Sequence, residues 1–209
     1  MMKKTHIVVG VALSSIVAVK SGIQLTPIYL VTSAIGAIMP DADHPHGAIN
    51  QKLLLVHNKW FKSLFYAAIA LIVLFYGTKS MDYKLVLYTV PVFLALGFSR
   101  HRSVTHSFLG LIGAMILMKF IKTSYGVDLV IPFTIGYASH ILIDMLNPQG
   151  VELLWPYDKN FKVPFISIDT GGIIEKISLY VFLIVFIYVF VGHNNIEGSF
   201  IASLVDKLF

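Results

Sequence analysis

Cysteine is absent from this chain of 209 residues, and charged residues are scarce. Without cysteine the chain can form no disulfide and offer no thiolate, so any bound metal ion must be held by nitrogen and oxygen atoms. Only 13% of the residues are charged, whereas soluble domains carry about 25%. Together with 56% hydrophobic residues and a mean hydropathy of +0.78, this scarcity predicts an integral membrane protein.

Acidic residues are fewer than basic ones, which leaves a net charge of +5 and a pI near 9.3. In a soluble protein this balance would suggest a nucleic-acid partner. Here the lysines stand at the ends of apolar segments, where they orient the chain and contact anionic lipid. We therefore expect membrane lipid as a partner and no nucleic acid, while the oligomeric state is left open.

Seven apolar segments predict an all-α bundle of about seven membrane helices in a single domain over residues 1–209. Several contain only 13 to 16 residues, which at about 1.5 Å per residue fall short of a hydrocarbon core of about 30 Å. We expect either that their ends extend through Lys and Tyr or that the bilayer is thin around the bundle. The segments are 7–19, 25–39, 63–76, 84–98, 108–121, 128–146 and 173–191.

Four polar clusters interrupt these segments, and counting membrane crossings places all four on the same face. Short links between the segments make neighbouring helices antiparallel, so the chain returns to the face of its N-terminus after every second crossing. Metal sites need several imidazole and carboxylate ligands at one point. The sequence therefore predicts a metal site at one end of the bundle. The clusters are His6, residues 40–44, residues 101–106 and residues 140–144.

The same count places most basic residues on the clustered face, which predicts that this face is cytoplasmic in a cell (inner) membrane. Of the 16 basic residues, ten fall there: Lys3, Lys4, Lys52, Lys59, Lys62, Arg100, Arg102, Lys159, Lys162 and Lys176.

His140 and Asp144 are four residues apart in an apolar helical segment, so their side chains share one face about one turn apart. An ionisable residue inside the bilayer costs about 2.5–3.5 kcal/mol on insertion scales, so Asp144 needs a compensating role. The pair is interpreted as metal ligands, with a structural hydrogen-bonded pair as the alternative.

Asp41, Asp43 and His44 directly follow the second segment, between Pro40 and Pro45. The prolines disfavour a continuing helix, so a fixed loop with two carboxylates and an imidazole is predicted. Such a loop suits a divalent ion, although Pro-Asp is also ordinary turn chemistry.

His101 and His106 would point about 140° apart on a regular helix. They can converge only if a helix begins between them, with Ser103 or Thr105 as its N-cap. Arg102 then lies near His106 and suits bidentate contact with a phosphate group. The alternative is that Arg102 is a positive anchor at a helix end.

The strings Pro40-Asp41-Ala42-Asp43-His44, His101-Arg102-x-x-Thr105-His106-Ser107 and Gly136-x-x-x-His140-x-x-x-Asp144 resemble those of a known family. Together with Thr5-His6 and Gly10, they make residues 2–191 similar to the YdjM-like family of membrane-bound metal-dependent hydrolases. The resemblance implies a helical inner-membrane protein that binds a divalent metal ion. It also implies eight candidate ligands, namely His6, Asp41, Asp43, His44, His101, His106, His140 and Asp144.

The sequence thus predicts a membrane-bound, metal-dependent hydrolase of a phosphoester or lipid-linked substrate, with one or two zinc or manganese ions. Arg102 is expected to bind the anionic group. His101 and His106 move protons or, with His6, complete the coordination of the metal. The first-choice ligands are Asp41, Asp43, His44, His140 and Asp144.

Two other functions are compatible with the same residues. A divalent-metal transporter would have its site near the midplane and would show inverted repeats, but no repeat is visible in the sequence. A noncatalytic scaffold, in which a metal ion staples helix ends together, would close the coordination that an enzyme keeps open.

Overall fold

The structure, a computed structural model, describes residues 2–47, 49–80, 83–164 and 167–193. Over these residues the chain forms eight α-helices and two 3₁₀ helices, and its only β-type pairing is an isolated bridge between Val151 and Phe161. The elements are α1 (Lys3–Lys20), α2 (Pro27–Ile38), η1 (Pro40–Asp43), α3 (Asn50–Leu53), α4 (Lys59–Lys79), α5 (Tyr83–Phe98), η2 (Val104–His106), α6 (Phe108–Tyr125), α7 (Val130–Met145) and α8 (Ile173–His193).

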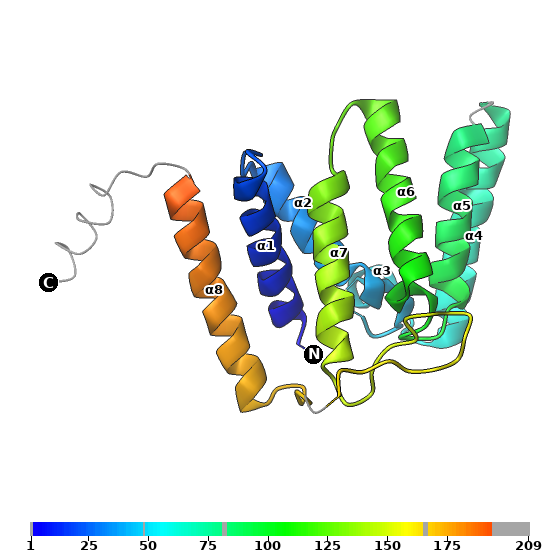
Figure 1. Ribbon diagram of the computed structural model, residues 1–209. Helices are drawn as coiled ribbons and strands as arrows, with labels where there is room; N and C mark the ends of the chain where they lie inside the picture. The colour runs from blue at the N-terminus through cyan, green and yellow to red at the C-terminus, as the bar shows by residue number, and fades with distance from the viewer. Residues whose placement is uncertain (1, 48, 81–82, 165–166, 194–209) are drawn as a thin grey trace, which may run out of the picture.

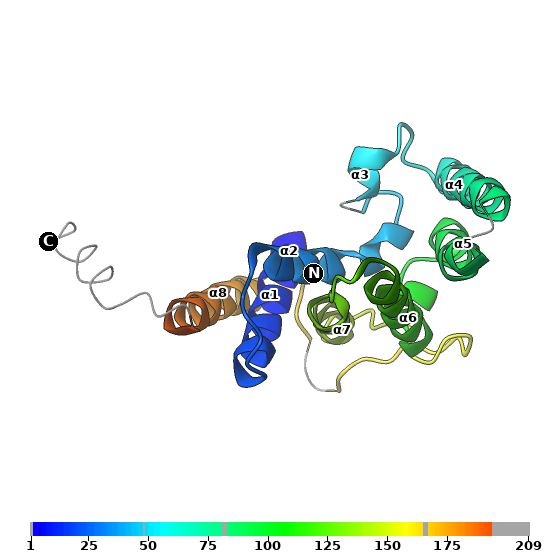
Figure 2. The ribbon, with the colours of Figure 1, turned by 90° about the horizontal axis from the view of Figure 1, so that it is seen from above.

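The all-α membrane bundle is confirmed, because the seven apolar segments correspond to α1, α2 and α4 to α8. Figure 1 shows these helices side by side, with the short connections at the top and the longer ones at the bottom. From above they form a curved row with α8 at one end and α4 and α5 at the other (Figure 2). The short α3 lies in the connection between α2 and α4.

Helix length differs between the outside and the inside of the row. The outer helices α4 and α8 have 21 residues each and mean hydropathies of 1.7 and 2.2, long and apolar enough to cross a membrane. Inside the row, α2 has only 12 residues and α7 has 16. Both short helices still expose apolar side chains, such as Val31 on α2 and Leu142 on α7, and polar residues lie at their site ends.

Side-chain caps set where several helices begin. The Thr26 hydroxyl accepts a hydrogen bond from Tyr29 N and starts α2, and Asn58 caps α4 in the same way through Phe61 N. Ser107 caps α6 by accepting from Gly110 N at 3.2 Å. The prediction that Ser103 or Thr105 caps this helix is therefore wrong.

The segment before α6 explains that correction. Residues 100–107 form an irregular turn in which the Ser103 hydroxyl donates to Arg100 O at 2.5 Å instead of capping a helix. Thr105 lies inside η2, and its hydroxyl is hydrogen-bonded elsewhere. Both His101 and His106 precede α6, so they converge through the turn and the short η2, which starts between them, and not through the start of α6.

Small residues bring α1, α2 and α7 into close contact, as is common between membrane helices. A Cβ atom at Gly36 would collide with the backbone carbonyl of Phe133, and one at Gly136 would collide with that of Ser33. The Ser33 hydroxyl also donates to Gly10 O at 3.1 Å. We call α1, α2 and α7 the central trio; their backbones approach closely at the level just above the site.

Candidate metal centre

The end of the central trio and the turn before α6 meet at one buried point. α2 leads directly into η1, which carries Asp41 and Asp43, while the last turn of α7 carries His140 and Asp144. The turn at η2 adds His106. His106, His140, Asp43 and Asp144 are all at most 2% exposed, so ionisable groups are packed together out of solvent.

Four side chains form a ligand quartet, which we define as Asp41, His106, His140 and Asp144. Nε2 of His106 and Nε2 of His140 are 3.2 Å apart, and Asp144 Oδ2 lies 3.4 and 3.5 Å from these two atoms. Asp41 Oδ1 lies 3.8 and 3.6 Å from the same two nitrogens. Tetrahedral ligands at about 2.0–2.1 Å from zinc are about 3.3–3.4 Å from one another. The quartet therefore fits a tetrahedral ion in its donor types and its spacing.

Hydrogen bonds fix both imidazoles with Nε2 available to a metal ion. His140 Nδ1 donates to the backbone carbonyl of Ala37 at 2.6 Å, and this carbonyl can only accept. His106 Nδ1 lies 3.1 Å from the Thr105 hydroxyl, which itself donates to Asp43 Oδ2 at 2.6 Å. In each neutral ring the proton is therefore on Nδ1, and the Nε2 lone pair points into the quartet.

Asp43 joins a second group with His101 and His106. Its Oδ1 accepts a hydrogen bond from His101 Nδ1 at 2.9 Å, and its Oδ2 lies 3.6 Å from His106 Nδ1. Lys62, on α4, donates from Nζ to the backbone carbonyl of Asp43 at 2.5 Å. His106 belongs to both groups, with Nε2 in the quartet and Nδ1 towards Asp43. Asp43 therefore has the position of a carboxylate that orients a candidate histidine ligand from its other ring nitrogen.

His6 and His44 lie beside the quartet and outside both groups. His6 Nε2 is 3.4 Å from Asp144 Oδ1, and its ring stacks on that of His140 at 3.9 Å between centroids. His44 Nδ1 accepts a hydrogen bond from His46 N at 3.1 Å, so a neutral His44 has its proton on Nε2. His44 then presents a donor to the site, and not a lone pair.

Arg102 is held by the loop that follows α7. Its Nη1 donates to Gly150 O at 3.1 Å and to Asn147 Oδ1 at 3.4 Å, and its backbone has a φ of 67°, unusual for a residue other than glycine. Nη2 lies 3.9 Å from Asp144 Oδ2, while Nε is buried without a hydrogen-bond partner among the described residues. Arg102 therefore lies beside the quartet, with Nη2 in a long ion pair with Asp144 and with an unused donor at Nε.

The charges of the turn residues favour a cation at this position. Burial alone would lower the pKa of His106, but the carboxylates of Asp144 and Asp43 outweigh it and raise this pKa to about 9. Burial would raise the pKa of Asp43, yet contacts with His101 and His106 hold it well below its usual range. The carboxylates that favour a proton on His106 would equally favour a divalent cation.

The quartet is not sealed from solvent. A cavity of about 260 Å³ reaches it, with a wall formed by Asp41, Asp144, Arg102, His101 and Lys3 among others. Asp41 is the quartet member with the greatest exposure, its side chain being 22% exposed against 3% or less for the other three. A small group can therefore approach the quartet from the side of Asp41.

Three residues that form hydrogen bonds around the site were not assigned these contacts from the sequence. Thr105 was considered only as a cap and Lys62 only as a basic anchor, but both contact Asp43. Glu175, fully buried at the start of α8, accepts hydrogen bonds from Met2 N at 2.5 Å and Gly171 N at 2.6 Å. A carboxylate in the first turn of an otherwise apolar helix was the available signal for Glu175.

The fold and the cluster define a helical membrane protein with a buried group of histidines and carboxylates that could hold a metal ion. The model of the family described as "YdjM inner membrane protein" matches residues 1–204, and the chain belongs to this family.

Two relatives illustrate how far the similarity extends. Inner membrane protein YdjM of Escherichia coli (strain K12) is 29% identical over 189 residues, which cover 84% of this chain and 76% of that protein. Uncharacterized protein YvsG of Bacillus subtilis (strain 168) is 28% identical over 182 residues, covering 86% and 88% of the two chains. No solved structure matches the chain.

Proposed function

We propose that the protein is a metal-dependent hydrolase that cleaves a phosphoester bond at the membrane surface. The observation that carries this proposal is the guanidinium of Arg102, with its unused Nε donor, beside a quartet with tetrahedral spacing. A purely structural metal site needs no anion-binding group, and an arginine cannot itself be a ligand because its guanidinium remains protonated. The pair of features instead suits a substrate that carries negative charge.

Asp41, His106, His140 and Asp144 would hold the ion, and zinc fits their number and donor types, with manganese as the alternative. Because four protein ligands alone would close the coordination, catalysis would require the ion to accept a further ligand from the side of Asp41, the most exposed of the four. A divalent ion at this position supplies the Lewis acidity that makes water a better nucleophile and offsets charge on the phosphoryl group. We expect one ion and not two, because His106 would need to give up the proton on Nδ1 to serve a second ion beside Asp43.

Arg102 would bind the phosphoryl group through Nε and Nη2, which together match two phosphoryl oxygens. Its loop contacts through Nη1 fix this orientation before substrate binds. Since the charge on those oxygens changes during the reaction, a preoriented guanidinium stabilises the transition state without reorganisation.

His101 would move the proton. Its Nδ1–H is held by Asp43, so the neutral ring presents the Nε2 lone pair, and its side chain is 33% exposed and lines the cavity. Nε2 would accept a proton from the attacking water as the new P–O bond forms. It would return that proton to the leaving oxygen as the ester bond breaks.

The decisive experiment is turnover of chromogenic phosphomonoesters and phosphodiesters by detergent-purified protein supplied with zinc or manganese. Arg102→Ala should lower turnover by about 10²–10³-fold while metal content and melting temperature remain near those of the parent. Lys162→Ala, which removes an exposed cation on the loop that follows α7, is the matched control and should behave as the parent. A metal-loaded parent that hydrolyses neither substrate class, or an Arg102→Ala variant with full turnover, would contradict the proposal.

We also propose that the site faces the cytoplasm, because the helix ends around it carry most of the basic residues. The absence of cysteine makes the orientation simple to measure. In sealed right-side-out vesicles, an impermeant thiol reagent should label Ser124→Cys and leave Gln51→Cys unlabelled, both positions being exposed at opposite ends of the bundle. The reverse pattern would place the site outside the cell.

A further inference from the structure

A second cleft lies beside the metal centre, between the site end of α4 and the site end of α5. It has a volume of about 880 Å³ and shares Asp43, His44 and His101 with the walls of the site. The smaller cavity at the quartet shares His44, His46 and His101 with it. A ligand in the cleft would therefore lie next to the quartet, with only these histidines between them.

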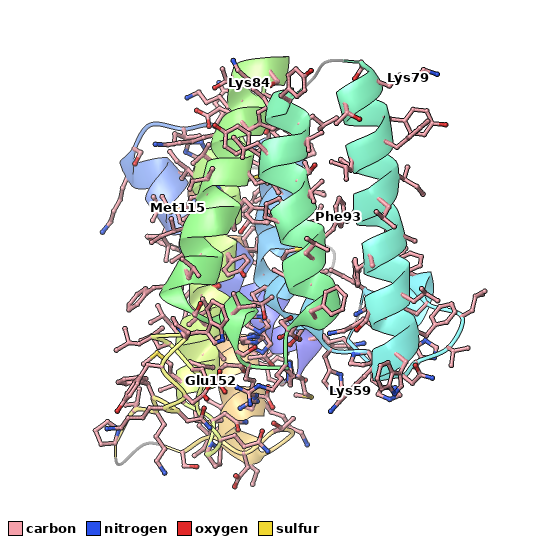
Figure 3. All side chains as sticks on the ribbon, turned by 90° about the vertical axis from the view of Figure 1, so that its right-hand side faces the viewer. Lys59, Lys79, Lys84, Phe93, Met115 and Glu152 are labelled. Carbon is pink, nitrogen blue, oxygen red and sulfur yellow. The ribbon has the colours of Figure 1, made fainter. Side chains whose placement is uncertain are left out.

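The residues around the cleft are of kinds typical of the membrane interface. Figure 3 shows α4 and α5 side by side, with Lys59 at the site end of the pair and Lys79 and Lys84 at the other end. Trp60, 86% exposed, and Phe98, 65% exposed, stand at the rim. Exposed aromatic residues at the end of a membrane helix favour the interface between hydrocarbon and water.

The charge of the lining suits an anion. Lys59, Lys62 and Arg100 line the cleft together with four imidazoles, and Asp43 is its only carboxylate. That carboxylate is buried and already accepts hydrogen bonds from His101 and Thr105. Lys62 and Arg100 have partners within the protein, which leaves exposed Lys59 as the cation at the mouth.

From these observations we infer that the cleft binds the phosphate-bearing head group of an anionic membrane phospholipid and presents its phosphoester to the quartet. The inference rests on the proposed function and names its substrate class. The acyl chains would remain in the bilayer along the exposed apolar faces of α4 and α5, which include Leu64, Leu71, Leu87 and Leu94. The phosphate would lie in the cleft beside the histidines that the cleft shares with the 260 Å³ cavity at the quartet.

The inference can be tested by ligand binding, independently of hydrolysis. In a Trp155→Phe background, Trp60 is the single tryptophan and its fluorescence reports occupancy of the rim. Dihexanoyl phosphatidylglycerol, titrated into the detergent-purified protein, should saturate this signal at lower concentration than dihexanoyl phosphatidylcholine. Glycerol 3-phosphate, a water-soluble phosphomonoester without acyl chains, should bind more weakly than either lipid.

The matched variants are Lys59→Glu and Lys79→Glu, which reverse one charge at opposite ends of α4. Lys59→Glu should weaken binding of the anionic lipid by at least about fivefold with unchanged metal content, and Lys79→Glu should not weaken it. Equal binding of the two lipids, or equal effects of the two variants, would overturn the inference. Tightest binding of glycerol 3-phosphate would assign the cleft to a water-soluble phosphate and overturn the lipid assignment. Neither of these lipid-binding results would bear on the proposed metal site. A parent protein that lacks metal but still prefers the anionic lipid would contradict only the proposed hydrolase.

Discussion

The central trio and the outer hairpin, which we define as α4 and α5, bury different kinds of side chain. α7 buries nine residues, including Ser139, His140 and Asp144, whereas α5 buries only Leu96 and Gly97. In the trio, close backbone contact excludes lipid and lets polar side chains find partners inside the protein. In the hairpin most side chains face outwards. The comparison indicates that the trio packs tightly around the site and that the hairpin forms a less buried wall beside it.

The hairpin packs on the site loop through an apolar cluster of Ala42, Tyr66 and Leu96, and a few polar side chains add hydrogen bonds. Lys62 joins α4 to the carbonyls of Asp43 and Ser99 at 2.5 and 3.1 Å. Tyr66 donates its hydroxyl to Asn50 Oδ1 at 2.7 Å, and Asn50 in turn donates to the carbonyls of Ala42 and His44 at 2.8 Å each. The hairpin therefore supports the loop that carries Asp41 and Asp43 without supplying a member of the quartet.

The largest effect is expected where the trio is most tightly packed. Gly136→Ala places a Cβ atom against the backbone carbonyl of Ser33, which cannot move as a flexible side chain would. We expect a loss of about 1–3 kcal/mol in stability and reduced metal binding, because His140 lies one turn further along α7. Thermal unfolding in detergent and elemental analysis would measure the two effects.

Gly113→Ala on α6 is the matched control, since a Cβ atom there meets nothing within 4 Å. It should leave both the melting temperature and the metal content unchanged or slightly higher, because alanine is the better helix former. If the two variants are equally stable, the close approach of α2 and α7 does not hold the site.

A smaller effect is expected from the carboxylate behind His106. Asp43→Asn keeps the shape of the side chain but removes the charge that orients His101 and His106. The affinity for metal should fall by about 10–100-fold, while the number of ions bound at saturation stays the same. Competition with a chelator of known affinity measures both quantities. Loss of an ion at saturation would instead make Asp43 a direct ligand. The control is Asp158→Asn, which changes an exposed carboxylate on the same face.

The smallest effect is expected at the link from the hairpin. Tyr66→Phe removes the hydrogen bond to Asn50 and should cost about 0.5–1.5 kcal/mol of stability. Metal content should be unchanged because Asn50 still contacts Ala42 and His44. Thermal unfolding with parallel metal analysis checks this, and a Tyr66→Phe protein that lacks metal would show that the hairpin is part of the rigid site.

The sequence predicted the helices well because their signal is local. Long apolar segments require helices in a membrane, and the spacing of His140 and Asp144 follows directly from helical geometry. The segment 108–121 begins where α6 begins, but its cap was predicted wrongly, because several hydroxyl residues in 103–107 compete as caps and tertiary contacts select Ser107. The separate positions of Asp41 and Asp43 depend on the path of η1, which no periodicity encodes.

Hydrogen bonds between residues far apart in the chain could not be predicted from the sequence either. The bond from His140 to Ala37 joins residues 103 positions apart, and that from Lys62 to Asp43 joins different helices and turns. Both depend on which glycines allow which backbones to approach. Lysines at helix ends are common in membrane proteins, so nothing local distinguishes Lys62 from an ordinary anchor.

Elemental analysis tests the central claim most directly: that Asp41, His106, His140 and Asp144 form a site for a divalent metal ion. Protein purified in detergent without chelator should contain about one zinc or manganese ion per chain, as the tetrahedral spacing of one quartet implies. The double variant His140→Ala with Asp144→Ala should lose this ion, and His193→Ala, at the far end of α8, should retain it. A folded parent protein without metal, or a double variant with the full amount, would contradict the claim.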